Sequence, residues 1–261
     1  SKLKKTDGEI RADFQLETPI LMNQEYTLRF DVTLDNGETY YYYTRLLQRA
    51  GTNISDYLEF ADNFYQTCLD SENASTLAAY LEPDETQTNS TYENLNIHSS
   101  FDRITWGTLD MKLEKEAVPV IKDMNETTCS IYLTYVLSDT PEDETTDYYN
   151  VTDFYRMRYA QSRVMLLDFE RNTQELYDGK HTELTSKGIN LGVADKDVQY
   201  QSNKSSDIVA FVQEGELWSY NRSANKATQI FSFRDGDLDE RENLQEHGIK
   251  IVRVEESGDI D

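Results

Sequence analysis

The first clear pattern in the chain is an alternation of apolar and polar residues from Glu25 to Leu34. A period of two predicts a strand with one buried face. Asn36-Gly37 follows, the residue pair that most favours a two-residue type I′ hairpin turn. The run of four tyrosines from Tyr40 to Tyr43 is therefore predicted to be the returning strand of a hairpin.

The turn length decides which tyrosines share the apolar face. With a two-residue turn, Val32 lies opposite Tyr41, so Tyr41 and Tyr43 join the apolar face. Tyr40 and Tyr42 then point to the other face, since neighbouring residues of a strand alternate. Tyr40 and Tyr42 are the candidate ligand-binding pair of the hairpin, unless the next element of the chain covers them.

That next element is predicted to be a helix from Ile54 to Leu69. Its apolar residues recur at spacings of three and four, which is typical of one helix face: Ile54, Tyr57, Leu58, Ala61, Phe64, Tyr65, Cys68 and Leu69. Asn53 or Ser55 is the candidate cap of its first turn. A second, shorter helix is predicted from about Glu72 to Leu81, before Pro83.

Strand patterns dominate the rest of the chain. Alternating and apolar runs predict a β-sheet between Asn94 and about Tyr177. Three shorter strands are expected at 207–213, 216–221 and 227–233. The predicted fold class is α+β, with a hairpin and helices in residues 1–92 and a mainly antiparallel β region in residues 93–261.

The stretch "DIVAFVQEGELWSYNRSANKATQIFSFR" contains those three strands and their two turns. It resembles one blade of a β-propeller of the TolB or WD type, and "VMLLDFERNTQELYDGK" before it has a similar strand-turn-strand order. The resemblance implies partial propeller-like blades in the C-terminal part. Ile249 to Val254 reads as a further strand, followed by a turn and no partner strand. We therefore expect the chain to be a piece of a larger protein, and the whole resembles extracytoplasmic regions of membrane-anchored bacterial proteins.

Charge restricts the partners. The chain carries 49 acidic and 25 basic side chains, a formal net charge of −24. Binding to nucleic acid needs clustered Lys and Arg to neutralise phosphates, so nucleic acid is excluded as the main partner. A small basic cluster at Lys2, Lys4 and Lys5 is either a juxtamembrane remnant or a solvated terminus. No apolar run is long enough to span a bilayer.

Two features bear on the compartment. Seven Asn-x-Ser/Thr sequons favour export, although Asn-, Ser- and Thr-rich bacterial surface proteins contain such sequons without glycans; they begin at Asn53, Asn73, Asn89, Asn125, Asn150, Asn203 and Asn221. Cys68 and Cys129 are the two cysteines, and they either pair in an oxidising compartment or pack on apolar faces. We expect an extracellular or cell-surface location.

The common catalytic motifs are missing from the sequence. His98, His181 and His247 are isolated, with no partner at the spacing of a zinc site. The chain contains no Gly-x-Ser-x-Gly, GxGxxG or phosphate-binding loop signature. With 49 acidic residues, any choice of a catalytic carboxylate pair is arbitrary. We therefore expect a protein that is not an enzyme and needs no cofactor.

One acidic segment, "DGDLDERENLQE", is a candidate calcium loop. Its oxygen-bearing residues match the spacing of an EF-hand: Asp235, Asp237, Asp239, Asn243 and Glu246. Glu240 stands where the EF-hand loop has glycine, and a strand precedes the segment in place of a helix. The alternative is that Asp237 or Asp239 caps a short helix near 238–247.

The expected function is non-catalytic recognition or signalling by an extracytoplasmic module of a membrane-anchored protein. Trp218 joins the tyrosine pair as a candidate ligand-binding residue, because an indole ring can stack on a sugar. The second candidate is therefore a cell-wall or carbohydrate-binding module, and the third an extracellular hydrolase. The expected partner is a protein or a cell-wall glycan.

Overall fold

The computed structural model describes residues 2–6, 9–70, 72–84, 86, 91–140, 146–179, 188–194, 196–233 and 248–261. The chain divides into two compact units, Ser1–Thr52 and Asn53–Asp261. The boundary that we predicted at residues 92 and 93 differs from this division, because the helix after Thr52 packs against the sheet of the second unit.

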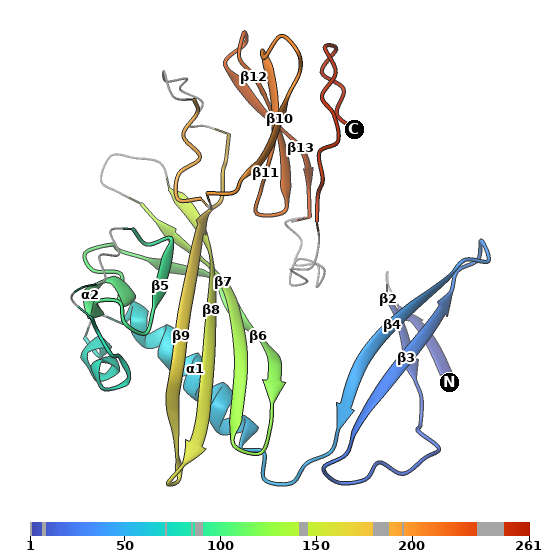
Figure 1. Cartoon of the computed structure of the whole chain (residues 1–261), viewed down its shortest axis with the longest axis vertical. Helices are drawn as coiled ribbons and strands as arrows, with labels where there is room; N and C mark the ends of the chain where they lie inside the picture. Colours follow the sequence, from blue (N-terminus) through green and yellow to red (C-terminus); the bar gives the residue numbers. More distant parts are fainter. Residues whose placement is uncertain are drawn as a thin grey trace. The chain divides into compact units, whose positions relative to one another are not determined.

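The first unit consists of two antiparallel strand pairs (Figure 1). Strand β1 (Lys2–Thr6) pairs with β2 (Glu9–Asp13), and β3 (Glu25–Thr33) pairs with β4 (Thr39–Leu47). We call β3, β4 and their connecting loop the aromatic hairpin. The hairpin itself confirms the sequence pattern, but its turn does not.

The turn of the aromatic hairpin has three residues, Asp35 to Gly37, and not two. The Leu34 amide donates to the Glu38 carbonyl, and the Gly37 amide donates to the Leu34 carbonyl, both at 2.9 Å. In this loop only Gly37 has a positive φ, of 86°, whereas a type I′ turn requires positive φ at Asn36 as well. The Asn36 side-chain oxygen accepts a hydrogen bond from the Glu38 amide, which favours the longer turn.

This one-residue difference shifts the register of the hairpin. Val32 lies opposite Tyr40, and Phe30 lies opposite Tyr42. Tyr41 and Tyr43 therefore share the other face. The predicted distribution of the tyrosines is wrong and is reversed, because a shift of one residue moves every side chain of a strand to the opposite face.

The second unit contains a five-stranded antiparallel sheet in the order β5-β9-β8-β7-β6. Its strands are β5 (Asn94–Asn96), β6 (Lys112–Met124), β7 (Thr128–Asp139), β8 (Asp147–Ala160) and β9 (Arg163–Glu175). Helix α1 (Ile54–Leu69) crosses one face of this sheet (Figure 1). A 3₁₀ helix, η1 (Ala74–Tyr80), and the short helix α2 (Phe101–Ile104) complete this layer.

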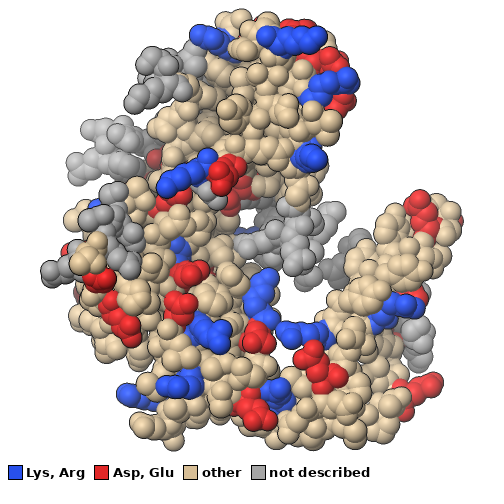
Figure 2. Space-filling view, viewed as in Figure 1, with Lys and Arg blue, Asp and Glu red and all other residues tan. Residues whose placement is uncertain are grey.

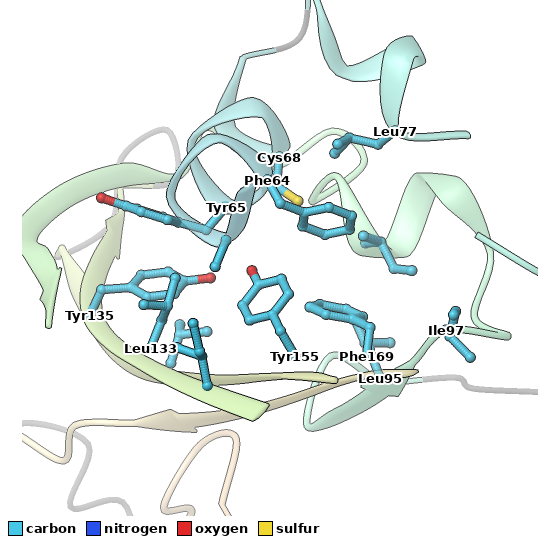
Figure 3. Packing of buried hydrophobic residues seen from close by; sticks show 14 of the residues in the cluster. Phe64, Tyr65, Cys68, Leu77, Leu95, Ile97, Leu133, Tyr135, Tyr155 and Phe169 are labelled. Carbon is cyan, nitrogen blue, oxygen red and sulfur yellow. The ribbon is translucent and has the colours of Figure 1, made fainter. Parts of the chain in front are cut away.

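The main core lies between α1 and the sheet. Figure 3 shows the rings of Tyr135, Tyr155 and Phe169 pointing from the sheet toward Phe64 and Tyr65 of the helix. These rings interlock, with centroids 5.5 Å apart for Phe64 and Tyr155 and 5.1 Å apart for Phe64 and Phe169. The buried residues of α1 are Tyr57, Ala61, Phe64, Tyr65 and Cys68, all of which belong to the predicted apolar stripe.

The helix bounds are confirmed, but of the two candidate caps Asn53 makes no capping contact with its side chain. Asn53 precedes α1 with a left-handed φ of 50°, and its side chain makes no capping hydrogen bond. An N-cap residue normally has extended backbone, which directs its side-chain oxygen at the first free amides. The second predicted helix is shorter than expected and is a 3₁₀ helix.

A four-stranded antiparallel sheet follows, in the order β10-β11-β12-β13. Its strands are β10 (Gln199–Ser202), β11 (Ile208–Gln213), β12 (Glu216–Asn221) and β13 (Lys226–Ser232), so the three predicted strands are present and β10 is additional. The predicted fold class is confirmed: a hairpin, a helix and then antiparallel sheets. The described residues form no closed propeller, and the family resemblance stays a prediction.

The C-terminal segment lies beside this sheet (Figure 1). Ile251 and Val254 pack against Ala210 of β11. Val254 forms a β-bridge with Ile260, and the Asp261 amide donates to the Arg253 carbonyl at 3.0 Å. The expected turn is present, but the last residues do provide a short partner for the preceding segment.

Candidate functional site

The residues that the sequence suggested for ligand binding belong to two different units of the chain. Tyr40 and Tyr42 lie on the aromatic hairpin of the first unit, where both are exposed. Trp218 lies on β12 of the second unit and is only 6% exposed. The calcium candidates lie outside the described residues: Asp235, Asp237, Asp239, Asn243 and Glu246.

The aromatic hairpin exposes a dense group of large apolar side chains. Twenty-one large hydrophobic side chains are exposed in the described residues; ten of these lie between Phe14 and Tyr43, and six of the ten belong to the hairpin. The four tyrosines are 46%, 56%, 58% and 65% exposed in chain order. Between Ala12 and Thr52 no side chain is fully buried, so the hairpin has no closed core of its own.

The two faces of the aromatic hairpin differ in chemistry. On one face Tyr40 and Tyr42 accompany Val32 and Phe30, and Phe14 packs edge-on against Phe30 at 5.5 Å. This face is apolar.

On the other face the Arg29 guanidinium lies 5.3 Å from the centre of the Tyr41 ring and bonds both carboxylate oxygens of Asp31. Tyr43 stands directly opposite Arg29. This face combines rings with charged hydrogen-bonding groups. The helix that we expected to cover the tyrosines, α1, packs on the five-stranded sheet of the second unit.

Charge is divided unevenly between the two units. Residues 1–52 contain seven Lys and Arg against eight Asp and Glu, so the remaining 209 residues contain 18 basic and 41 acidic side chains. The first unit is nearly neutral, and the second carries almost all of the negative charge. On the face visible in Figure 2, basic side chains are scattered among acidic ones. This distribution offers a polyanion no continuous basic surface on that face.

A second chemical constellation, which the sequence reasoning missed, is buried under α1. Arg171 of β9 and Asp153 of β8 are direct cross-strand neighbours, and both side chains are 0% exposed. The Arg171 Nε and Nη2 atoms donate to the two Asp153 oxygens at 2.7 and 2.9 Å. The hydroxyls of Tyr135 and Tyr155 donate to Asp153 Oδ2 at 2.9 Å each.

The remaining Arg171 donors are also satisfied. Nη1 donates to the Ile104 carbonyl at 2.7 Å, and the guanidinium lies 4.7 Å from the centre of the Trp106 ring. Burial alone would lower the pKa of Arg171, but the charge of Asp153, its hydrogen bond to Arg171 and the neighbouring Tyr135 and Cys68 together outweigh burial and raise the pKa, so the guanidinium stays charged. Burial likewise raises the pKa of Tyr135 and Tyr155 well above the usual value, so both phenols stay protonated as donors.

This network, closed from solvent, holds strands β8 and β9 together and joins them to the segment around α2. A substrate has no path to its polar atoms, because both charged side chains are fully buried. The role of the network is therefore to stabilise the fold. The sequence does contain a signal for it, since Asp153 and Arg171 occupy inward positions of alternating strands between buried Val151 and Tyr155, and between Phe169 and Thr173.

The two cysteines are free and buried. Cys68 lies on α1, where its sulfur is 3.7 Å from Arg171 Nη2, and Cys129 lies on β7. The second alternative from the sequence, packing on apolar faces, therefore holds. Burial raises the pKa of both thiols to about 11.

These pKa values predict thiols that are inert in the folded protein. Only the thiolate reacts, so iodoacetamide at pH 8 is expected to leave both cysteines unmodified by mass spectrometry, and to label both in guanidinium chloride. Since the ordinary thiol pKa is 9.0, the thiols ionise more readily in the unfolded chain. Stability should fall as the pH rises from 9 toward 11. Rapid labelling of the native chain would contradict the buried placement.

Two features are absent from the described residues, a membrane-spanning helix and a metal-binding cluster. No helix there is long and apolar enough to cross a membrane. In the same part of the chain, no three His, Cys, Asp or Glu side chains come together as a metal-binding group.

Comparison with known proteins identifies no relative. No protein-family model, no curated protein and no solved structure matches the chain significantly.

Proposed function

We propose that this chain is a non-catalytic extracytoplasmic recognition module whose aromatic hairpin contacts a protein partner. The observation that supports this proposal most strongly is that Tyr40 to Tyr43 expose rings on both faces of a two-stranded sheet with no closed core. An isolated two-stranded hairpin is only marginally stable in water, so a surface that covers these rings also stabilises the hairpin.

The side chains of the hairpin suit a protein interface. Tyrosine and arginine are enriched at interfaces, because both bury a large area and keep a polar group for hydrogen bonding. Tyr41 and Tyr43 lie beside Arg29, which gives this face both stacking and ionic contacts. Because residues 1–52 are nearly neutral, the hairpin unit itself adds almost no long-range repulsion toward an acidic or a basic partner surface.

The free edge of β4 adds a second mode of contact. In the described chain β4 pairs only with β3, and "TYYYYTRLL" contains one charged residue and no proline. Natural edge strands usually carry charges or proline that prevent pairing with another chain. An edge without these features fits recognition by strand addition, in which an extended segment of the partner continues the sheet.

The sequons support the extracytoplasmic part of the proposal. Asn73 and Asn125 are exposed, as an attached glycan would require. Asn203 is 3% exposed, and its side-chain amide donates a hydrogen bond to Asp207, so this asparagine stabilises a loop of the folded chain. Asn73 and Asn125 are therefore accessible for glycan attachment, whereas Asn203 is not.

The proposal is tested by photo-cross-linking in the native cell. A benzophenone amino acid replaces Tyr42 in the full-length protein, and after irradiation a discrete adduct with a second protein is expected on gels and by mass spectrometry. The matched control carries the probe at Tyr200 of β10, an equally suitable tyrosine that is 71% exposed on the second unit. A similar adduct pattern from both positions, or no adduct from position 42, argues against recognition by the hairpin. An adduct with a second copy of the chain would show that the hairpin mediates self-association and not recognition of a different protein.

A further inference from the structure

A polar and aromatic hollow lies on the five-stranded sheet, on the face away from α1. Its volume is about 500 Å³, within the range of small-molecule sites. Strands β5, β7, β8 and β9 all contribute to it. The lining residues whose side chains are not buried in the core are Asn94, Asn96, Tyr132, Thr152, Phe154, Glu170 and Asn172.

The register of the sheet explains why these residues meet. Asn96 pairs with Glu170, Glu170 with Phe154, and Phe154 with Tyr132, so the four side chains form one row across four strands. Their neighbours along each strand, such as Leu133, point into the core on the other face. At about 4.8 Å between strands, the row extends over roughly 14 Å.

One half of the row is an aromatic wall. The rings of Tyr132 and Phe154 lie 5.0 Å apart at 46°, and both side chains are half-buried. The Lys122 ammonium lies 5.4 Å from the centre of the Tyr132 ring, at the side of this wall. The rings present an apolar surface with polar groups at its margin.

The other half is a set of oriented amides and one carboxylate. Asn172 Nδ2 donates to Asn94 Oδ1 at 3.0 Å, and Gln174 Nε2 donates to Asn172 Oδ1 at 3.1 Å. These contacts fix the Asn172 amide. Within the described residues the Glu170 carboxylate has no hydrogen-bond partner, so it is available as an acceptor beside the rings.

The strands under the hollow are held rigidly. Asp153 and Arg171, which form the buried ion pair, alternate along β8 and β9 with residues that line the hollow: Thr152, Phe154, Glu170 and Asn172. The network therefore fixes the spacing of the two strands from below. A site on packed strands with locked neighbours loses little entropy when it binds a ligand.

We propose that this hollow binds a neutral saccharide. A sugar ring has an apolar face that stacks on aromatic side chains and hydroxyls that pair with amides and carboxylates. A purely apolar ligand would leave Glu170 desolvated and unpaired, which is unfavourable. An anionic ligand would meet that carboxylate and a chain of net charge −24. The hollow lies apart from the aromatic hairpin in the chain, so this inference and the proposed function stand or fall separately.

The test uses the whole chain, labelled with ¹⁵N, and three neutral probes: chitotetraose, cellotetraose and maltotetraose. At least one is expected to shift the side-chain amide signals of Asn94, Asn96 and Asn172 saturably. Tyr132→Ala and Glu170→Gln should each weaken the association constant by about tenfold, by loss of a stacking ring and of a charged acceptor. Glu170 is exposed, so Glu170→Gln should leave folding intact.

Tyr148→Ala is the matched control. Tyr148 is an exposed tyrosine on the same face of β8 but outside the hollow, so its removal should leave saccharide affinity unchanged. An equal loss of affinity in Tyr148→Ala and Tyr132→Ala, or the absence of saturable amide shifts with all three probes, would overturn the proposal. Shifts produced by an extended peptide and by none of the saccharides would also overturn it.

Discussion

Replacement of Asp153 by alanine is expected to destabilise the chain by about 3–5 kcal/mol. The change leaves the Arg171 guanidinium fully buried without its counter-charge and removes the acceptor of two tyrosine hydroxyls. A buried charge that loses its partner retains its desolvation cost, which exceeds the value of an ordinary hydrogen bond. Urea unfolding followed by circular dichroism measures the change.

Two further variants separate the charge from the loss of side-chain volume. Asp153→Ala combined with Arg171→Met should recover part of the lost stability, because no uncompensated charge remains. Asp110→Ala removes a surface partner of Lys112 and should leave the urea midpoint unchanged, since Asp110 is 85% exposed. A loss below about 1 kcal/mol in Asp153→Ala would show that the ion pair is not buried as described.

Replacement of Trp218 by alanine is expected to destabilise the four-stranded sheet and its surroundings by about 3–5 kcal/mol. The indole packs against Tyr177 with ring centroids 5.0 Å apart, and its Nε1 donates to Glu216 at 3.2 Å. Gly179 lies so close that a Cβ there would come within 3.0 Å of the indole. A well-fitted ring of this kind leaves a cavity when truncated.

The same variant decides between packing and sugar stacking for Trp218. Trp218→Phe should cost less than Trp218→Ala in urea unfolding, because a phenyl ring fills part of the cavity. If Trp218→Ala unfolds at the wild-type urea concentration and loses affinity for a glycan, the ring is a binding platform and its core placement is contradicted.

Local patterns predicted the elements that depend on neighbouring residues. The spacing of Tyr57, Phe64 and Tyr65 gives the helix and its buried face, because one helix face must cover the sheet. Strands β11, β12 and β13 of the four-stranded sheet also follow from their alternation and turns. Asn53 does not cap the helix with its side chain, because its backbone is left-handed.

The predicted register of the hairpin is wrong because the same turn sequence is compatible with two loop lengths. Asn36-Gly37 suits a two-residue turn, but Gly37 also suits the left-handed position after a type I turn. The Asn36 hydrogen bond to Glu38 belongs to the longer loop. As a result, Tyr40 and Tyr42 are on the face opposite to the one predicted, although all four tyrosines are exposed.

The buried network and the sheet-face hollow were not predicted, because both depend on pairing between residues far apart in the sequence. Asp153 and Arg171 are 18 residues apart, and Tyr132 and Asn94 are still further apart. Their meeting depends on strand order and register, which no local period encodes. Both the buried network and the sheet-face hollow arise only when β5, β7, β8 and β9 align.

The central claim, recognition through the aromatic hairpin, is tested most directly by the yield of the cross-linked adduct from position 42 in two backgrounds. One background is otherwise wild type, and the other carries Tyr41→Ser and Tyr43→Ser, which remove two exposed rings and should leave the melting temperature unchanged. The account predicts a discrete adduct in the first background and its loss in the second. An adduct of equal yield in both would contradict it.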